Sequence, residues 1–467
     1  MNQGLRRVAL GLAFSFLVLG LGLVYWQVWR ADALQNNPAN RRLILLEDRV
    51  KRGGIFDRNG EILAQTQVIG GKKTRVYPKG EVFEPMVGYA TLQHGSAGLE
   101  GAIGDWLLGV KDATFTQQLQ QVFNLPRQGN DAVLTIDARI QQAAFDALKG
   151  KQGAAVAIDP RNGEVLALVS EPGFNPNGLD DNWTTISTQT GSPLRNHAFS
   201  LFPPGSTMKV VTSLALFRAG INTTELYDCG GSTIIHGQAI HEQNDKAHGW
   251  VNYNLALADS CNTYFATYAE KAGTDKFLAA AKAFGFGQSL PLELSVPRSS
   301  LTKAEALPAK LDPTLLPASA FGQGEVMVSP FHMALIAAGI ANQGVIMQPH
   351  VVERVLGEDG KPVYTSPVEP WLTAMSKDEA AKITSGMITA VNEGTASPGA
   401  IADAQVAAKT GSAEPGGNVP THAWYIAFAP AEAPRIAVAV LVENGGTGGG
   451  AAAPIARQMI QSALSRK

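Results

Sequence analysis

Several features that mark large classes of protein are scarce or missing in this chain. Its 467 residues include two cysteines, which are too few for a disulfide framework. Basic and acidic side chains nearly balance, 38 against 40, so the formal charge of −2 provides no positive field to attract nucleic acid. The sequence also has no internal repeat and no low-complexity tract. These absences exclude a disulfide-stapled module, a nucleic-acid-binding protein and a repeat array.

The sequence offers no convincing thiol or metal site either. A single bridge could join Cys229 to Cys261, but Cys261 lies inside a motif described below, so we expect two free thiols. Metal-ligating side chains occur together near the middle of the chain, at His236, His241, Glu242, Asp245 and His248. The spacing of the three histidines fits no common zinc pattern and favours a solvated loop. We therefore expect chemistry that needs neither a metal ion nor a cofactor.

The chain does contain one long apolar run. The 22 residues from Val8 to Trp29 carry no charge. At about 1.5 Å per residue a helix of this length reaches roughly 33 Å, enough to cross a hydrocarbon core of about 30 Å. Two arginines precede the run, and a tyrosine and two tryptophans at its far end are typical of an interfacial belt. A cleaved signal peptide is the alternative, because Ala31-Asp32-Ala33 matches a cleavage site, but the run is long for that role. We predict a single-pass anchor in the cell membrane, with the body of the protein outside the cytoplasm.

The body of the chain combines strand and helix patterns. Hydrophobic residues make up 45% of the sequence and charged residues 17%, so a large core is available. Two hairpin patterns lie far apart, at 154–170 and 422–443, and a further strand is predicted at 406–410. Helical patterns occur at 138–148 and 454–464 and dominate residues 200–400. Strands from both ends of this region must therefore join one sheet, with a helical insertion between them.

These patterns divide the chain into three parts with an overall α+β fold class. Residues 1–30 form a cytoplasmic tip and the transmembrane anchor. Residues 31–130 form a small non-catalytic α+β module, which opens with a short connector at 31–50 and a strand–turn–strand pattern at 51–64. An amphipathic stretch follows there from Gly98 to Leu108. Residues 131–467 form the catalytic domain.

The string Ser206-Thr207-Met208-Lys209 supplies a nucleophile and a base. Two prolines and Gly205 stop the chain just before Ser206, and an apolar helix pattern follows. Ser206 therefore lies at a helix start, where free N–H groups favour an oxyanion nearby. Lys209 lies three residues on, on the same face. A lysine acts as a base only if its pKa falls, which burial and a second cation, Lys409, would achieve. We predict that Ser206 is the nucleophile and Lys209 its base.

The spacing S-x-x-K alone is weak, because chance produces it about once or twice in a chain of this length. A second copy runs from Ser300 to Lys303. There Thr302 and Glu305 form a capping-box pattern, which predicts an ordinary helix start. The competing interpretation of Ser206 is likewise an N-cap serine with a surface lysine. Two further motifs in a fixed order favour catalysis at Ser206.

The second motif is Ser260-Cys261-Asn262. The hydroxyl of Ser260 can pass a proton between Lys209 and a leaving amine, and Asn262 offers an amide to a peptide carbonyl. On its own this motif carries no signal, because S-x-N is common. Its meaning comes from its place between the other two.

The third motif, Lys409-Thr410-Gly411-Ser412, lies on a predicted edge strand. Gly411 lets a ligand approach the backbone, and the side chains of Lys409, Thr410 and Ser412 can hold a carboxylate. An extended peptide can add to such a strand as a further strand. The backbone amides of Ser206 and Ser412 would then form the oxyanion hole.

The three motifs in this order resemble those of class B penicillin-binding proteins, which are membrane-anchored peptidoglycan D,D-transpeptidases. Flanking strings resemble that family too: RGGIFDRNGEILA at 52–64, FPPGSTMK at 202–209, HGWVNYNLALADSCNTYF at 248–265, FGQGEVMVSP at 321–330 and KTGSAE at 409–414. The resemblance covers nearly the whole chain. It implies a penicillin-binding/β-lactamase-like transpeptidase domain, with a mixed, mostly antiparallel sheet flanked by helices and an all-helical subdomain.

The resemblance also implies a substrate and partners. The donor would be a peptidoglycan stem peptide ending in D-Ala-D-Ala, the acceptor the amine of a neighbouring stem peptide, and β-lactams would acylate Ser206. Lys209 and Ser260 would share in catalysis. Substrate binding would fall to Asn262, Lys409, Thr410, Gly411 and Ser412. The membrane partner implied is a polytopic glycosyltransferase of the SEDS type.

Three other activities use the same groups. A serine β-lactamase must activate water, but no E-x-x-L-N string follows Ser260 and position 261 is not aspartate. A D,D-carboxypeptidase would release D-Ala without cross-linking. A membrane sensor would be acylated by β-lactams and turn over no peptide. The fate of the acyl group distinguishes all four activities.

Overall fold

The structure of the protein, a computed structural model, describes residues 3–30, 50–91, 93–112, 123, 127–304, 306–414, 416 and 419–465. The apolar run forms helix α1 (Gln3–Val24) and a π-helical turn, η1 (Tyr25–Trp29). All residues of this 27-residue segment are exposed, and it is long and apolar enough to cross a membrane. Tyr25 packs edge-on against both tryptophans at its end. The predicted connector at 31–50 lies outside the described residues except for Val50.

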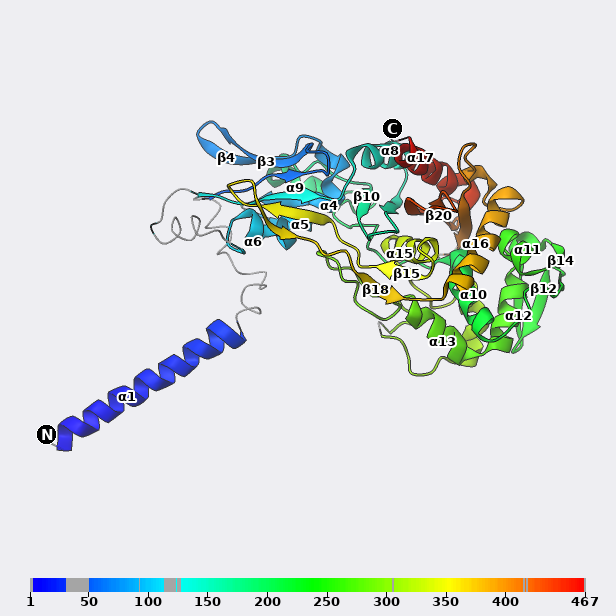
Figure 1. The fold of residues 1–467 in the computed structure, drawn as a ribbon, viewed down its shortest axis with the longest axis horizontal. Coiled ribbons are helices and arrows are strands. Elements are labelled where there is room, and N and C mark those ends of the chain that lie inside the picture. The colour runs from blue at the N-terminus through cyan, green and yellow to red at the C-terminus, as the bar shows by residue number, and fades with distance from the viewer. Residues whose placement is uncertain are drawn as a thin grey trace.

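A six-stranded sheet forms the centre of the next part of the protein (Figure 1). Its strands run in the order β17 (Pro362–Thr365), β16 (Val352–Leu356), β8 (Asp131–Leu134), β2 (Ile55–Phe56), β3 (Ile62–Ile69) and β4 (Lys72–Val76). β2 and β8 pair in parallel, and the other pairs are antiparallel. The predicted strand–turn–strand pattern is β2, a turn and β3. Because β16 and β17 lie within the helical insertion, between α15 and α16, this sheet joins strands of the predicted module to strands of the predicted catalytic domain.

Short elements complete the module. They are β1 (Val50–Lys51), paired in parallel with β7 (Arg127–Gln128), η2 (Gly80–Val82), α4 (Glu84–Val87), the hairpin β5 (Tyr89–Thr91) and β6 (Gly95–Ala97), α5 (Gly98–Ala102) and α6 (Gly104–Leu107). The stretch predicted from Gly98 to Leu108 is therefore two short helices. Buried Glu100 on α5 accepts hydrogen bonds from Arg52 and Arg75, both at 2.6 Å. Burial raises the pKa of Glu100, but the two arginines outweigh it and lower the pKa overall.

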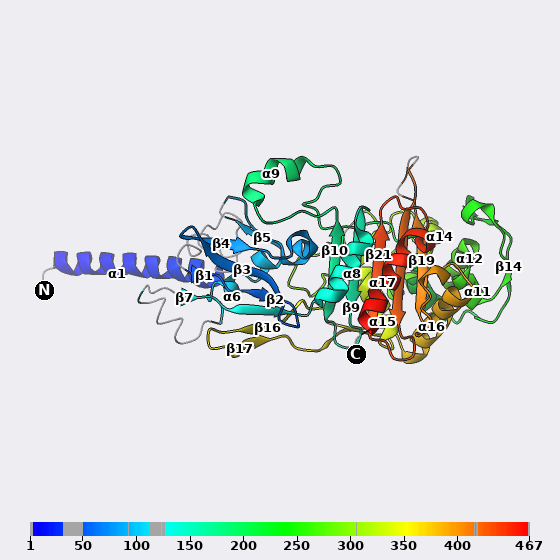
Figure 2. The ribbon, with the colours of Figure 1, turned by 90° about the horizontal axis from the view of Figure 1, so that it is seen from above.

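A five-stranded antiparallel sheet is the core of the predicted catalytic domain (Figure 2). Its strands run in the order β10 (Val165–Glu171), β9 (Gly153–Ile158), β21 (Ile436–Val442), β20 (His422–Ala429) and β19 (Ala407–Ala413). Both predicted hairpins and the strand predicted at 406–410 are therefore present. Strands from the two ends of the domain do join one sheet, and β19 lies at its edge.

Helices cover both faces of this sheet, which explains why β9, β10, β20 and β21 are buried throughout. α8 (Ala138–Leu148) and α17 (Ala453–Leu464) pack together on one face, and α15 (Pro330–Ala341) packs on the other. The side chain of Asp137 caps α8 as predicted, accepting from the backbone N–H of Arg139. α15 is apolar all round and wholly buried, because it lies between the sheet and α16 (Lys377–Asn392).

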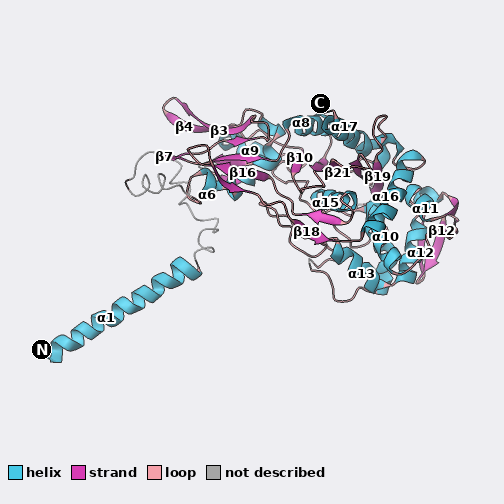
Figure 3. Ribbon diagram, viewed as in Figure 1, coloured by secondary structure: helices cyan, strands magenta, loops and turns pink. Residues whose placement is uncertain are grey.

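The insertion between β10 and β19 is mostly helical, as predicted (Figure 3). Besides α15 and α16, its helices and helical turns are α9 (Leu179–Thr188), η3 (Gly205–Met208), α10 (Lys209–Arg218), η4 (Gln243–Asp245), α11 (Tyr253–Ala258), α12 (Asn262–Ala272), α13 (Thr274–Ala283), η5 (Pro313–Leu315), α14 (Leu316–Ser319) and η6 (Ser397–Gly399). Short strand pairs interrupt it: β11 (Tyr227–Cys229) with β14 (Gly249–Val251), β12 (Ser232–Ile235) with β13 (Gln238–His241), and β15 (Val345–Met347) with β18 (Pro370–Thr373). A last turn, η7 (Gly448–Ala452), leads into α17.

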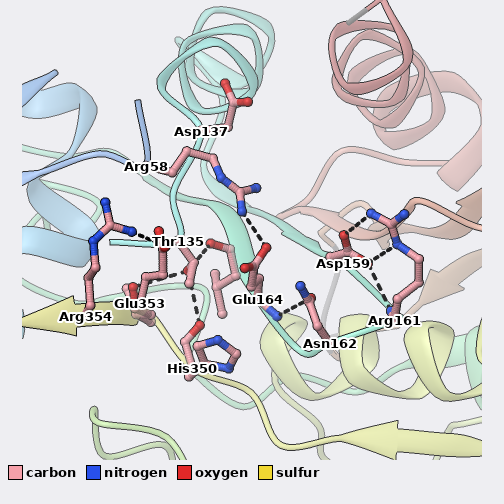
Figure 4. Close-up of polar contacts among 12 residues, drawn as sticks. Arg58, Thr135, Asp137, Asp159, Arg161, Asn162, Glu164, His350, Glu353 and Arg354 are labelled. Carbon is pink, nitrogen blue, oxygen red and sulfur yellow. Dashed lines mark hydrogen bonds and ion pairs between the residues drawn. The ribbon is translucent and has the colours of Figure 1, made fainter. Parts of the chain in front are cut away.

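Polar contacts link the two large sheets (Figure 4). Arg58, in the turn after β2, lies 2.5 Å from Glu164, in the turn between β9 and β10. The Thr135 hydroxyl donates to the carbonyl of Val165 at 2.7 Å. These contacts lie at the β10 edge of the catalytic sheet, so the module meets the edge opposite to β19.

The helix start predicted at the second S-x-x-K string is wrong. Ser300 is a buried bridge residue that exchanges backbone hydrogen bonds with Met327, at 2.9 and 3.0 Å. Residues 301–304 form bends, and Glu305 lies outside the described residues. The side chain of Lys303 is 88% exposed. Pairing with a distant segment overrides the local capping pattern, as tertiary context often overrides local propensity.

Candidate active site

Ser206 lies in the turn η3, immediately before α10, so the predicted position at a helix start is confirmed. Gly205 has a φ of 54°, and a Cβ atom on it would lie 2.8 Å from the carbonyl oxygen of Ser412 on β19. Only glycine lets the turn and the strand approach so closely. The indole N–H of Trp424 donates to the carbonyl of Pro203 at 2.9 Å and fastens the turn to the sheet. Ser206 itself is half-buried.

Lys209, at the first position of α10, is fully buried. Its Nζ atom donates hydrogen bonds to the second motif: 2.6 Å to the carbonyl oxygen of Ser260, 3.1 Å to Ser260 Oγ and 2.7 Å to Asn262 Oδ1. Burial lowers the pKa of Lys209 well below its usual value, and the charge of Lys409 lowers it further against the opposing charge of Glu242. A lowered pKa is what a base requires, but the hydrogen bonds of Lys209 to the described residues run to Ser260 and Asn262 and not to Ser206.

Lys409, on β19, approaches the same hydroxyl from the other side. Its Nζ lies 2.9 Å from Ser260 Oγ and 3.0 Å from the carbonyl oxygen of Thr410. Burial lowers the pKa of Lys409 to about 7, against the opposing charge of Asp259. A hydroxyl between two amines can accept a hydrogen bond from one and donate to the other. Ser260 is therefore placed to pass a proton between the two lysines.

The backbone of the second motif is held in an unfavourable conformation. Ser260 has a φ of 65°, in the left-handed region that a side chain of this type seldom adopts. Such a residue costs about 1–3 kcal/mol and persists only where its surroundings fix it. Cys261 follows as the N-cap of α12, so Asn262 is the first residue of that helix.

The third motif lies on the edge strand, as predicted. β19 pairs with β20 on one side only, and no further strand pairs with its other side within the part of the chain that the structure describes, so it is an edge strand. Gly411 is packed tightly, since a Cβ atom there would lie 2.9 Å from the carbonyl oxygen of Pro204. Ser412 is half-buried beside the turn of Ser206. Thr410 is buried, and its hydroxyl lies 2.7 Å from that of Thr395.

Two residues that support these motifs were not predicted. Buried Glu242 accepts from the backbone N–H groups of Asn262 and Thr263, at 2.8 Å each, and so fixes the start of α12. Thr395 links the third motif to the end of α11, just before the second motif, because its hydroxyl lies 2.7 Å from that of Thr410 and 3.1 Å from the carbonyl oxygen of Ala258. No sequence pattern connects either residue to its partners, which only the tertiary fold brings together.

The prediction of two free thiols is wrong. Cys229 and Cys261 form a disulfide, with their Cα atoms 6.5 Å apart. The bond forms because β11 lies directly beside the start of α12. The two cysteines are 32 residues apart in the sequence, so no local pattern predicts this contact. It ties the central residue of the second motif to β11.

The histidines of the predicted solvated loop separate in the structure. His236 pairs with Glu270 and His241 with Asp245, at 2.9 and 2.8 Å, and the first pair is about one-third exposed while the second is mostly exposed. His248 instead turns inward to Cys229, and Glu242 is buried, so the prediction of a solvated loop is wrong for these two residues.

A separate cavity of about 550 Å³ lies beside α4 and the hairpin of β5 and β6, and includes Glu84, Tyr89 and Phe199. It contains no residue of the three motifs. We place the chemistry at the motifs, because an extended peptide binds along an open strand edge and needs no deep cavity.

Comparison with known proteins agrees with this geometry. The family model "Penicillin binding protein transpeptidase domain" matches residues 153–461, and "Penicillin binding protein A dimerisation domain" matches residues 52–132. The chain belongs to the penicillin-binding protein transpeptidases.

Several members of this family are similar over nearly their full length. The peptidoglycan D,D-transpeptidase PbpA of Mycolicibacterium smegmatis is 38% identical, with 99% of each chain covered. The ceftriaxone acyl-enzyme of penicillin-binding protein A from Mycobacterium tuberculosis is 34% identical, with a TM-score of 0.84 over 90% of this chain and 100% of that one. PBP2 of Pseudomonas aeruginosa is 31% identical, with a TM-score of 0.77 over 90% of this chain and 97% of the other. The predicted class B penicillin-binding protein fold is therefore confirmed.

Proposed function

We propose that this protein is a peptidoglycan D,D-transpeptidase that cross-links stem peptides through an acyl-enzyme on Ser206. The observation that carries the proposal is one hydroxyl, Ser260 Oγ, that lies 3.1 and 2.9 Å from the amines of two buried lysines, of which Lys209 follows the half-buried Ser206 by three residues. The names of the similar relatives support the reaction class, and one solved relative is itself a β-lactam acyl-enzyme. The reaction belongs to bacterial cell-wall synthesis, during growth or division.

In the first half-reaction the Ser206 hydroxyl attacks the carbonyl carbon of the penultimate D-Ala. Its proton passes to the neutral amine of Lys209. The carbonyl oxygen becomes an oxyanion, which the backbone N–H groups of Ser206 and Ser412 stabilise. The C–N bond then breaks, and the terminal D-Ala leaves as an amine after taking a proton from Lys209 through Ser260.

In the second half-reaction the amine of a neighbouring stem peptide attacks the acyl-enzyme. The proton transfers of the first half-reaction are reversed. Lys209 takes a proton from the attacking amine through Ser260, and the Ser206 oxygen receives a proton as its bond to the acyl carbon breaks. Attack by an amine rather than by water separates this activity from that of a carboxypeptidase or β-lactamase. β-Lactams acylate Ser206 because their strained amide occupies the place of the D-Ala-D-Ala bond.

Substrate binding follows from the open edge of β19. The donor peptide adds as a strand along Gly411 and Ser412, with its backbone amides paired to the strand. Asn262 donates its side-chain amide to a peptide carbonyl. The terminal carboxylate is held by the hydroxyls of Thr410 and Ser412 and by the positive charge of Lys409.

We further propose that α1 and η1 anchor the protein by a single pass, with the catalytic domain outside the cytoplasm, where peptidoglycan lies. Residues 31–130 would form the non-catalytic module and residues 131–467 the transpeptidase domain. The six-stranded sheet supports a mechanical link between them, because it takes strands from both. A polytopic glycosyltransferase of the SEDS type would bind at the anchor and module and supply the glycan strands.

Mass spectrometry of the intact, penicillin-treated protein tests this function. We expect one stable adduct, which Ser206→Ala removes and Ser300→Ala leaves unchanged. An adduct that persists in Ser206→Ala removes the proposed nucleophile. The time course of the adduct separates one rival, because its rapid loss indicates a β-lactamase. Incubation of the untreated protein with a pentapeptide donor separates the others: release of D-Ala without cross-links indicates a carboxypeptidase, and no release indicates a sensor.

A further inference from the structure

Within the described residues, the strand pair of β11 and β14 leaves one of its two faces uncovered. Asp228 on β11 lies opposite Trp250 on β14, so the two side chains share a face. Leu226, two residues before Asp228, takes the same side of the chain. Trp250 is 66% exposed, Leu226 is 57% exposed, and Asp228 is exposed as well. We call these three residues the shelf.

The opposite face of the same strand pair packs against α12 and holds the shelf in place. The ring of Tyr227 meets those of Tyr264 and Tyr268 edge-on, with centroids 5.6 and 5.8 Å apart. Cys229 is buried on this side and is joined to Cys261 at the start of α12. The shelf is therefore a preformed surface, and a ligand that binds there does not have to order it first.

The side chains of the shelf suit a neutral sugar. An exposed indole ring is a flat apolar plate whose electron-rich face attracts the C–H groups of a sugar ring, and Leu226 extends the apolar area. The carboxylate of Asp228 makes no hydrogen bond or ion pair with the described residues, so its oxygens can accept from sugar hydroxyl or acetamido N–H groups. The same negative charge repels phosphate and carboxylate groups, which argues against an anionic polymer or lipid surface.

The shelf lies close to the second motif. The Cα atoms of Cys229 and Cys261 are 6.5 Å apart, and their neighbours in the chain are Asp228 and Ser260. With the usual spacings along and between strands, the Cα atoms of Trp250 and Ser260 are at most about 20 Å apart. A peptide of five residues spans at most about 17 Å. A sugar whose stem peptide reaches the motifs is therefore within reach of the shelf, and Figure 1 shows β14 beyond α12 at one end of the molecule.

We propose that Leu226, Asp228 and Trp250 bind the glycan strand of peptidoglycan, a polymer of N-acetylated amino sugars. The choice of this polymer rests on the proposed function, because the stem peptides that enter the active site are attached to such a strand. One sugar ring stacks on Trp250, and its hydroxyl or acetamido N–H groups donate to Asp228. No covalent step is involved. Binding of the strand at the shelf keeps its stem peptides at a high effective concentration beside β19.

Sugar binding is measured with the full chain in detergent and a soluble oligomer of N-acetylglucosamine, which carries neither peptide nor charge. Ligand-observed NMR titration gives the dissociation constant. We expect saturable binding by the wild-type protein. Trp250→Ala should weaken it by about 10-fold or more, and Trp250→Phe, which keeps a flat ring, should recover part of the affinity. Asp228→Ala removes one hydrogen-bond acceptor and should weaken binding by about 5-fold.

A matched control and a second measurement sharpen the test. Val368 is 60% exposed between β17 and β18, away from the shelf, so Val368→Ala should bind the sugar as the wild type does. The second measurement compares kcat/KM for D-Ala release from a glycan-linked pentapeptide with that from the free pentapeptide. Trp250→Ala should lower this ratio about 10-fold, whereas Val368→Ala should keep it. Circular dichroism verifies that each variant is folded.

A wild-type protein that binds no sugar, or equal binding by folded Trp250→Ala, would overturn the proposal. So would an equal loss of binding in Val368→Ala. If light scattering shows that Trp250→Ala changes the oligomeric state while sugar binding is kept, the shelf is a contact between copies of the chain and the proposal fails. The sugar titration uses no catalytic step, so its failure leaves the transpeptidase proposal standing. Sugar binding without D-Ala release from either donor would refute the transpeptidase and leave the shelf.

Discussion

Replacing Lys409 with methionine removes one of the two cations at Ser260 while nearly keeping the length of the side chain. The amines of Lys209 and Lys409 lie 3.1 and 2.9 Å from the same oxygen, so they are at most about 6 Å apart. At that separation and an effective dielectric constant of about 20, two unit charges repel by about 2.8 kcal/mol. This energy corresponds to a factor of roughly 100 in a protonation equilibrium.

The direction of the effect follows from the role of Lys209. Its pKa is lowered by burial and by the charge of Lys409, so Lys409→Met raises it and leaves less neutral amine at a given acidic pH. The pKa of Lys409 is about 7, so its charge is present mainly below that pH. We expect the acidic limb of the penicillin acylation rate to move to higher pH, with a loss of roughly 100-fold near pH 6 that shrinks in alkaline buffer.

The measurement is the second-order rate constant for acylation across the pH range. The charge with which Lys409 helps to hold the substrate carboxylate is itself present mainly below pH 7, so the size of the loss also depends on pH, and only the midpoint of the acidic limb reports on Lys209. Lys303→Met is the matched control, because Lys303 belongs to the second S-x-x-K string and is 88% exposed, and it should leave the profile unchanged. A limb that stays in place in Lys409→Met would show that the two amines are not coupled and that Lys209 is not the base.

Two further predictions concern residues outside the motifs. Thr395→Val removes the hydroxyl that contacts both Ala258, just before the second motif, and Thr410. We expect the acylation rate to fall about 10-fold, because one hydrogen bond of about 1 kcal/mol is lost and its partner is left unpaired. Thr395→Ser keeps the hydroxyl and should restore the rate. A folded Thr395→Val protein with an unchanged rate constant would refute that role. Burial lowers the pKa of His332 from 6.5 to about 4. As the pH falls, the unfolded chain therefore takes up the proton before the folded protein does. The free energy of unfolding should decrease by about 3 kcal/mol between pH 6.5 and pH 4. His332→Gln should flatten that loss in denaturant titrations at each pH, and an equally steep loss in the variant would contradict the assignment.

Sequence patterns were sufficient where the signal is local. The hairpins at 154–170 and 422–443, the helix capped by Asp137 and the turn before Ser206 each combine a turn or cap residue with a regular hydrophobic period. The edge position of β19 was also predicted correctly. This strand carries the third motif and precedes the hairpin at 422–443, whose two strands are both apolar. Local rules failed at Ser300, where the capping pattern was real but pairing with Met327 decided the structure.

The parts of the site that could not be predicted are contacts between distant segments. Glu242 reaches the start of α12 from a loop some twenty residues earlier, and Thr395, just after α16, reaches Ala258 before the second motif and Thr410 in the third. The disulfide was predicted wrongly for the same reason, because its partner strand β11 carries no signal of its own. The motifs identify the reacting groups, whereas the groups that hold them in place come from segments without a motif.

The chemistry of Ser260 explains why reacting groups lie in motifs while the groups that support them come from distant segments. Its hydroxyl must lie between two amines that burial deprives of solvent, and its backbone must stay in a left-handed conformation that costs about 1–3 kcal/mol. Neither condition is stable by itself, so the flanking backbone has to be fixed on both sides. Thr395 holds the carbonyl of Ala258 before Ser260, while Glu242 and the disulfide hold Asn262 and Cys261 after it. The second motif is therefore the point where the fold contributes most to the reaction, although it is the motif with the weakest signal in the sequence.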